Sequence, residues 1–127
     1  MKALKIEIPL LPVYLVQGQE DIYKIKELKG YVLPDLDGAI AKALHVAHTG
    51  TGVNAVVVYH PTLLTEQPAQ ITATLVHESC HAWDFIRDFF GYGNCSELHA
   101  YAVENIFSAL YARYAKLHHK FKGDDNA

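Results

Sequence analysis

The sequence predicts an α+β fold, with a small, mostly antiparallel sheet and about three helices. Three features support this class: two long segments of helical periodicity in the C-terminal half, the β-branched run VNAVVVY at 53–59, and short alternating segments near the N-terminus. The chain has 127 residues, of which 50% are hydrophobic and 20% charged. That length supports one core rather than two. We expect a single domain over residues 1–122 and a disordered polar tail over 123–127.

The N-terminal part predicts short strands. Residues 2–8 alternate between apolar and charged side chains, as in a strand with one buried face. Pro9 and Pro12 restrict strand pairing and precede a second extended segment at 13–16. Alternation resumes at 22–26, which predicts a further strand joined by a connection of hairpin length.

One helix is predicted in the N-terminal half, at residues 36–47. Pro34 and Asp35 suit its start, because proline and acidic side chains favour the first turn of a helix. Glycines follow it and mark its end, and the strand 53–59 comes next. The apolar stripe of this helix comprises Leu36, Ile40, Ala43, Leu44 and Ala47.

Two long helices make up the C-terminal half. Pro68 suits the first turn of the first one, which runs to Phe90 and is broken by Gly91 and Gly93. The second covers residues 95–119. Its apolar positions at helical spacing are Ala100, Val103, Phe107, Leu110, Tyr114 and Leu117.

The first long helix contains the pentapeptide HESCH, in which His77, Glu78 and His81 form an HExxH motif. Histidines four residues apart project from one face of a helix, so both imidazoles can reach a single zinc ion. The glutamate beside them is then close to the ion's open position. The motif therefore predicts a Zn²⁺ site on this helix.

A catalytic zinc needs a third protein ligand and an open fourth position. The metzincin extension HExxHxxGxxH is absent, because Asp84 and Arg87 occupy its glycine and third-histidine positions. A glutamate from the next helix is available at Glu97. Glu104, two turns further along the same face, is the first alternative, followed by Asp84 and His99.

With these residues in view, the chain resembles the small gluzincins, HExxH metallopeptidase-like domains of the zincin fold. The matching pieces are VNAVVVY, HESCH and ELHAY at 97–101. The glutamate–alanine pattern of ELHAY is also similar to the ligand helix of intracellular regulatory metallopeptidases that cleave repressors. The resemblance covers about the C-terminal two-thirds of the chain.

The resemblance implies a zinc metallopeptidase that hydrolyses amide bonds in a polypeptide. His77, His81 and Glu97 would be the zinc ligands, and Glu78 the general base that takes a proton from zinc-bound water. The strand at 53–59 would be the edge strand that aligns the substrate.

Two of these assignments have alternatives. Thermolysin-like enzymes carry an aspartate where this chain has Tyr101, so a histidine at the site must be oriented differently. An oxyanion is stabilised by a nearby tyrosine or histidine, and Tyr101 is our candidate, ahead of His99, Tyr92 and His60. Asn94 precedes Glu97 by three residues, which also fits a capping box in which the glutamate only satisfies a backbone amide.

Further histidines and both cysteines have structural interpretations. His45 and His48 could hold a second metal, but we expect them to interact with the dipole at the end of the helix 36–47. Cys80 and Cys95 are too few for a disulfide framework, and we expect reduced, partly buried thiols, with a single bridge between them as the alternative.

Net charge and hydropathy limit the classes of partner that we expect. The net charge is −3 and the pI about 6.2, so no nucleic-acid partner is expected. Neither a signal peptide nor a membrane span is expected, which predicts a cytoplasmic protein of undetermined oligomeric state. The alternative function is a non-catalytic zinc-binding regulatory or interaction protein on a zincin scaffold, encoded by a virus or mobile element.

Overall fold

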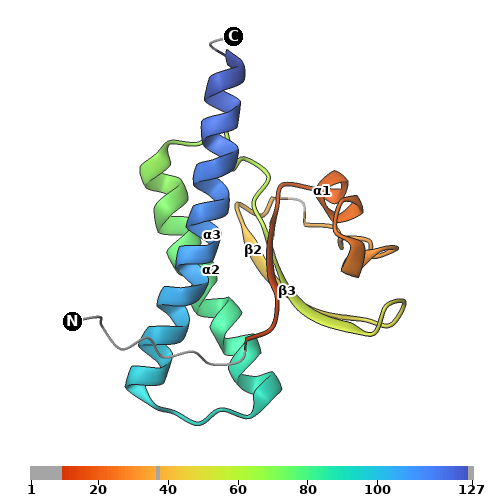
Figure 1. Cartoon of the computed structure of the whole chain (residues 1–127), viewed down its shortest axis with the longest axis vertical. Helices are drawn as coiled ribbons and strands as arrows, with labels where there is room; N and C mark the ends of the chain where they lie inside the picture. Colours follow the sequence, from red (N-terminus) through yellow and green to blue (C-terminus); the bar gives the residue numbers. More distant parts are fainter. Residues whose placement is uncertain (1–9, 37, 126–127) are drawn as a thin grey trace, which may run out of the picture.

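The computed structural model describes residues 10–36 and 38–125. The strands and the short helices come first along the chain, and two long helices follow (Figure 1). The predicted strand at 2–8 lies outside the described residues. In chain order the elements are β1 (Val13–Val16), α1 (Gln19–Tyr23), the short 3-10 helix η1 (Lys26–Leu28), β2 (Lys42–His48), β3 (Val53–Tyr59), α2 (Pro68–Phe90) and α3 (Ser96–Asp125).

The three strands form one mixed sheet in the order β1-β3-β2. β1 runs parallel to β3, with Val13 opposite Val56, and β2 runs antiparallel to β3, with Ala43 opposite Val58. The α+β class is thus confirmed, whereas the mostly antiparallel sheet is a mixed one. Strand β3 lies at its centre, so the prediction that 53–59 is an edge strand is wrong.

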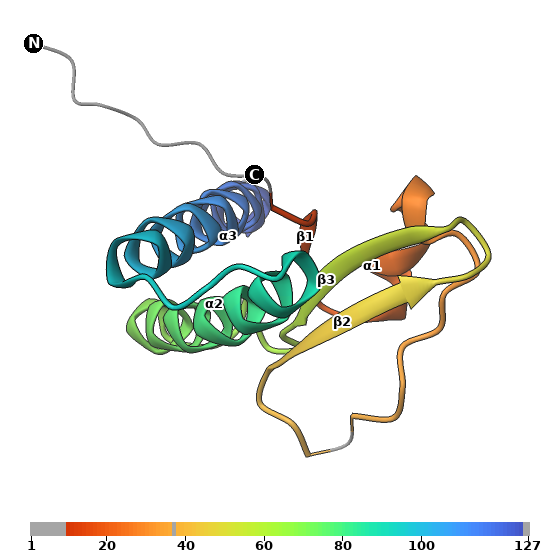
Figure 2. The ribbon, with the colours of Figure 1, turned by 90° about the horizontal axis from the view of Figure 1, so that it is seen from below.

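The sheet separates two apolar clusters, because side chains alternate across a strand. Val56 and Val58 face α2 and α3, and Ala55 and Val57 face α1 and η1. Figure 2 shows this layering, with the two long helices on one side of the sheet and α1 on the other. Two buried faces explain why β3 is a continuous apolar run rather than an alternating one.

The helix predicted at 36–47 is wrong, because residues 42–48 form β2. The glycines after it belong to a hairpin turn, in which Gly52 has a φ of 72° and its N–H donates to the carbonyl of His48 at 2.7 Å. Ala43 and Val46 are buried on opposite faces of the sheet. Pairing along all seven residues of β3 outweighs the helical preference of alanine and leucine.

The strand predicted at 22–26 is also wrong. Helix α1 ends at Tyr23 and η1 begins at Lys26. Ile22 and Leu28, both fully buried, anchor these two short helices against the sheet. The apolar residues around 22–26 are spaced as on a helical turn, of which only one side faces the sheet.

The two long helices follow the predicted pattern closely. α2 starts at Pro68, and Gly91 ends it in the left-handed conformation, with a φ of 72°. α3 starts at Ser96 and continues through Asp125, so residues 123–125 of the expected tail are helical. Within the described ranges, no helix combines the length and apolarity needed to cross a membrane.

His60, which follows β3, supplies a test of this fold by pH. Its side chain is 1% exposed, and neither ring nitrogen has a hydrogen-bond partner in the described structure. Burial lowers the pKa of His60 below its usual 6.5, and the Glu66 carboxylate and the residue's own backbone offset only part of this effect. The folded protein therefore favours the neutral imidazole.

We expect the free energy of unfolding to fall as the pH drops below about 6.5, since the unfolded chain then binds a proton that folded His60 resists. Above that pH both states are neutral at this residue and the contribution is constant. Urea denaturation between pH 8 and about pH 5 measures it. His60→Leu should reduce the acid-side slope, and an unchanged slope would contradict the assignment.

Candidate metal centre

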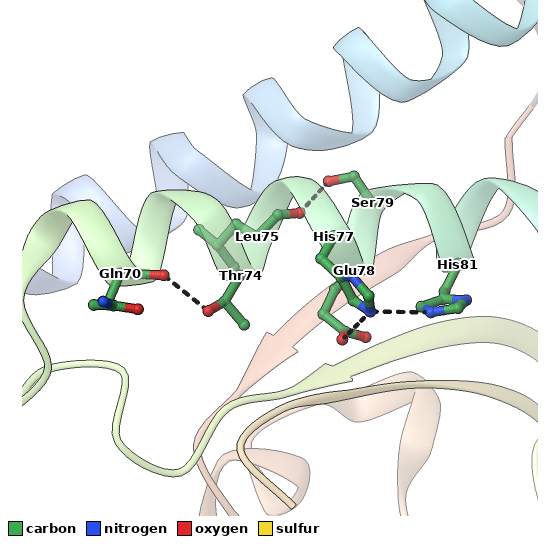
Figure 3. Close-up of polar contacts among 7 residues, drawn as sticks. All are labelled: Gln70, Thr74, Leu75, His77, Glu78, Ser79 and His81. Atoms are coloured by element: carbon green, nitrogen blue, oxygen red, sulfur yellow. Dashed lines mark hydrogen bonds and ion pairs between the residues drawn. The ribbon is translucent and has the colours of Figure 1, made fainter.

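His77 and His81 lie one turn apart on α2 with their rings together. Their Nε2 atoms are 3.2 Å apart and the rings meet edge to face, with a centroid distance of 4.8 Å (Figure 3). Two nitrogens bound to a tetrahedral zinc at about 2.0–2.1 Å are about 3.3 Å from each other. The pair therefore has the spacing of a zinc chelate, and both side chains are exposed enough to be reached from solvent.

Glu78 projects from the same side of α2 as the two histidines (Figure 3). Its Oε1 is 3.9 Å from Nε2 of His77, and only 4% of the residue is exposed. Its other oxygen, Oε2, is buried without a hydrogen-bond partner in the described structure. Burying an unsatisfied carboxylate oxygen is costly, so a nearby cation or a proton donor would stabilise the arrangement.

A small open pocket adjoins this cluster. It has a volume of about 340 Å³, and Ile40 and Ala41 form its wall on the side of the sheet. Across it lie Thr74, His77 and Glu78 of α2. Because Ile40 and Ala41 lead directly into β2, the edge strand beside HExxH is β2 rather than the predicted 53–59. Gly50 and Gly52, which follow residues 42–48 and form the hairpin turn, were the feature that could have identified this strand.

The predicted third ligand does not join the histidine pair. Among the described residues, no group of three or more His, Cys, Asp or Glu side chains has a metal-binding arrangement. Glu97 is exposed in the first turn of α3, and it makes no hydrogen bond or ion pair within the described ranges. Glu104 is exposed on the same helix. The structure thus provides two nitrogen donors and a buried carboxylate.

The capping alternative for Glu97 is not formed either. Asn94, its proposed partner, has its Oδ1 3.3 Å from the guanidinium of Arg87, which donates to it. Arg87 also lies 3.6 Å from the carboxylate of Asp84, one of the alternative ligands. These three side chains tie the end of α2 to the connection that leads into α3.

The remaining candidates for the oxyanion position are distributed over the molecule. Tyr92 stacks on Trp83 at 5.9 Å, and His99 meets the edge of Trp83 at 6.4 Å, so both cluster around this indole. Tyr101 is half-buried on α3. His60 is enclosed at the end of β3. Trp83, rather than the HExxH pair, is the residue that two of these side chains share.

His45 and His48 lie on opposite faces of β2, because an odd spacing alternates sides in a strand. His45 stacks on Phe85 at 6.0 Å, whereas Nε2 of His48 lies 2.7 Å from the carbonyl of Lys29. They therefore share neither a metal nor a helix end, and both interpretations made from the sequence are wrong. Cys80 and Cys95 are free, and both are exposed, so the prediction that they are partly buried is wrong.

Comparisons with known proteins do not add to this picture: no family model, no curated protein and no solved structure matches the chain. The site must therefore be judged on its own geometry.

We expect the purified protein to bind zinc, and His77→Ala and His81→Ala each to weaken binding by at least about a hundredfold, because each removes half of the nitrogen pair. Calorimetric titration of the metal-free protein measures this. His119→Ala, which removes an exposed histidine from α3, is the matched control. Unchanged zinc affinity in both helix α2 variants would show that the pair is not a metal site.

Proposed function

We propose that this protein is a zinc-dependent metallopeptidase of the gluzincin type that hydrolyses amide bonds in polypeptides. The single observation that supports this most is the geometry of HExxH: two imidazole nitrogens 3.2 Å apart, with a buried carboxylate 3.9 Å from one of them. A helix that only needed solvated histidines has no reason to bury the glutamate between them. The resemblance to gluzincins is the second support.

The roles of the residues follow from their positions. His77 and His81 hold the metal through Nε2, and the rigid middle of α2 fixes their spacing. Zinc, when bound, supplies a Lewis acid that polarises a carbonyl and acidifies a water. Glu78 receives the proton at its carboxylate and can return it to the leaving amine. Burial of Glu78 beside the open pocket keeps that carboxylate at the site and limits competing contacts with bulk water.

Glu97 remains our proposal for the third ligand, on the resemblance alone. Reaching the histidine pair would require the first turn of α3 to change its position relative to α2. The Glu97 side chain is exposed and makes no hydrogen bond or ion pair with the described residues, so none of these would have to break in such a change. Glu104 is the alternative donor on the same face of α3. Tyr101, half-buried between them, is proposed to stabilise the developing oxyanion.

Strand β2 is the element that we propose aligns the substrate. It is an edge strand, and the residues that lead into it line the pocket beside Glu78. An extended peptide could add to its free edge through backbone hydrogen bonds, which accommodate many sequences. The exposed side chain of Ile40 would contact the substrate at the entrance.

The second candidate function is a non-catalytic zinc-binding regulatory or interaction protein. It is favoured by one observation: the described residues bring together two nitrogen donors without a third protein ligand. Such a protein would need no base, and the burial of Glu78 is then unexplained. In either case we retain the cytoplasm as the proposed compartment, where free thiols such as Cys80 and Cys95 persist.

Glu78→Gln separates the two functions. If the carboxylate is the general base, the zinc-loaded variant should hydrolyse a denatured protein mixture about 10²- to 10⁴-fold more slowly than wild type, with its zinc content unchanged. Peptide release from the denatured mixture measures the rate, and metal analysis checks loading. Glu66→Gln, an exposed glutamate in the loop before α2, is the matched control. Equal rates in wild type and Glu78→Gln would refute the peptidase proposal.

A further inference from the structure

A second groove lies at the other edge of the sheet, along β1. It has a volume of about 540 Å³ and is bounded by β1, by the end of α1 and by the C-terminal half of α3. Figure 2 shows α3 beside β1, on the far side of the sheet from β2. No residue of the HExxH motif lines this groove. It is therefore separate from the candidate metal centre.

The wall formed by β1 is the strand edge that faces away from β3. The carbonyl of Pro12 accepts a hydrogen bond of 2.8 Å from the N–H of Val56 in β3, and the carbonyl of Val16 accepts one of 2.9 Å from the N–H of His60, just after β3. Backbone groups alternate between the two edges of a strand, so those of Val13 and Leu15 point the other way, towards the groove. No strand in the described part of the chain pairs with this edge. Such an edge is a template for one more strand.

The opposite wall is positively charged. Arg113, Lys116 and Lys120 line the groove from one face of α3, since their spacings of three and four residues repeat the helical turn. All three are exposed and make no ion pair within the described ranges. This concentration of cations stands out in a chain whose net charge is −3.

The end of α1 adds a fourth cation and the only carboxylate among the residues that line the groove. Lys24 lies 4.0 Å from Asp21, whose other oxygen accepts a hydrogen bond of 2.7 Å from the backbone of Gln17. Asp21 is thus already engaged locally. No carboxylate that lines the groove therefore pairs with the three cations of α3, which are available to a negatively charged ligand.

Apolar side chains form the floor between these charged walls. Leu15 and Leu110 are buried there, and Ile25 and Leu117 are half-buried. A strand that lies along β1 would direct alternate side chains to this floor and to the charged rim. The groove therefore matches a segment in which apolar and acidic residues alternate.

We propose that this groove binds an extended acidic peptide segment of another protein, which adds as a strand to the free edge of β1. The backbone edge supplies the hydrogen bonds, the floor takes the apolar residues, and Arg113, Lys116 and Lys120 pair with the acidic ones. A nucleic acid would also meet the cations, but it has no use for a strand edge. Tyr14, the one aromatic residue that lines the groove, is directed towards Glu27. This proposal does not depend on peptidase activity.

The charge requirement is tested by fluorescence anisotropy with a short dye-labelled peptide in which valine alternates with glutamate. Wild-type protein should bind it, more weakly at high salt, and Lys116→Glu/Lys120→Glu should weaken binding by about tenfold or more. Lys122→Glu, on the same helix but outside the groove, is the matched control. A second peptide, in which valine alternates with lysine, tests the sign of the charge. Equal loss in the Lys122→Glu control, or equally tight binding of the valine–lysine peptide, would overturn the proposal.

The strand requirement is tested separately. Val13→Pro removes the N–H of residue 13, which faces the groove, at an edge position where proline is tolerated. The loss of this donor should weaken binding by about fivefold. Two further peptides carry N-methyl groups on alternate backbone nitrogens, one at the odd and one at the even positions. Methylation of the nitrogens that face β1 should abolish binding, and methylation of the other set should leave binding intact. Binding that survives both methylated peptides, or displacement of the peptide by a short single-stranded oligonucleotide at lower concentration, would refute strand addition.

Discussion

The burial of β3 on both faces is the constraint on which the rest of this structure depends. Ala55, Val56, Val57 and Val58 are completely buried, and the strand is paired along both edges. A strand in this position needs cover on each side, which α1 with η1 supplies on one face and the two long helices on the other. The remaining strands are then confined to the edges. Both candidate binding surfaces lie at these edges.

Helix α2 has one face that is buried in the core and another that carries the HExxH side chains. Ile71, Leu75 and Ile86 pack into the core, and the same helical turns carry His77 and His81 outward. Glu78 falls at the boundary between the two faces, which is why it is buried although glutamate side chains are seldom buried. A purely structural helix would place an apolar residue there. The retained carboxylate is thus the most informative departure from good packing in the molecule.

The sequence alone predicted the elements whose pattern is local. Helix α2 is bracketed by Pro68 and Gly91, and the β-branched run of β3 has no competing interpretation. The two imidazoles were predicted for the same reason, because their spacing is a property of one helix. Residues 42–48 were misassigned because alanine and leucine suit a helix, whereas the glycine turn at 50–52 and pairing with β3 decide the outcome.

The position of a third ligand could not be predicted from the sequence in the same way, since it depends on how α3 packs against α2. Sequence spacing places Glu97 just after the connection, but the position of that turn relative to His77 is set by the contacts of Trp83, Tyr92 and Arg87. Packing between two helices of this kind leaves no repeating pattern in the sequence from which it could be predicted. The edge position of β1 could not be predicted from the sequence either, because the order of strands in a sheet is not encoded in any single segment.

The two proposed surfaces lie on opposite edges of a three-stranded sheet. Adjacent strands are about 4.8 Å apart, so β1 and β2 are separated by about 10 Å across β3. One extended segment cannot pair with both edges, but two segments of one polypeptide can when a flexible linker joins them. An acidic segment held along β1 would then raise the effective concentration of the linked segment at β2. Its benefit would appear as tighter substrate binding with an unchanged chemical step, because the groove contacts neither Glu78 nor the histidine pair.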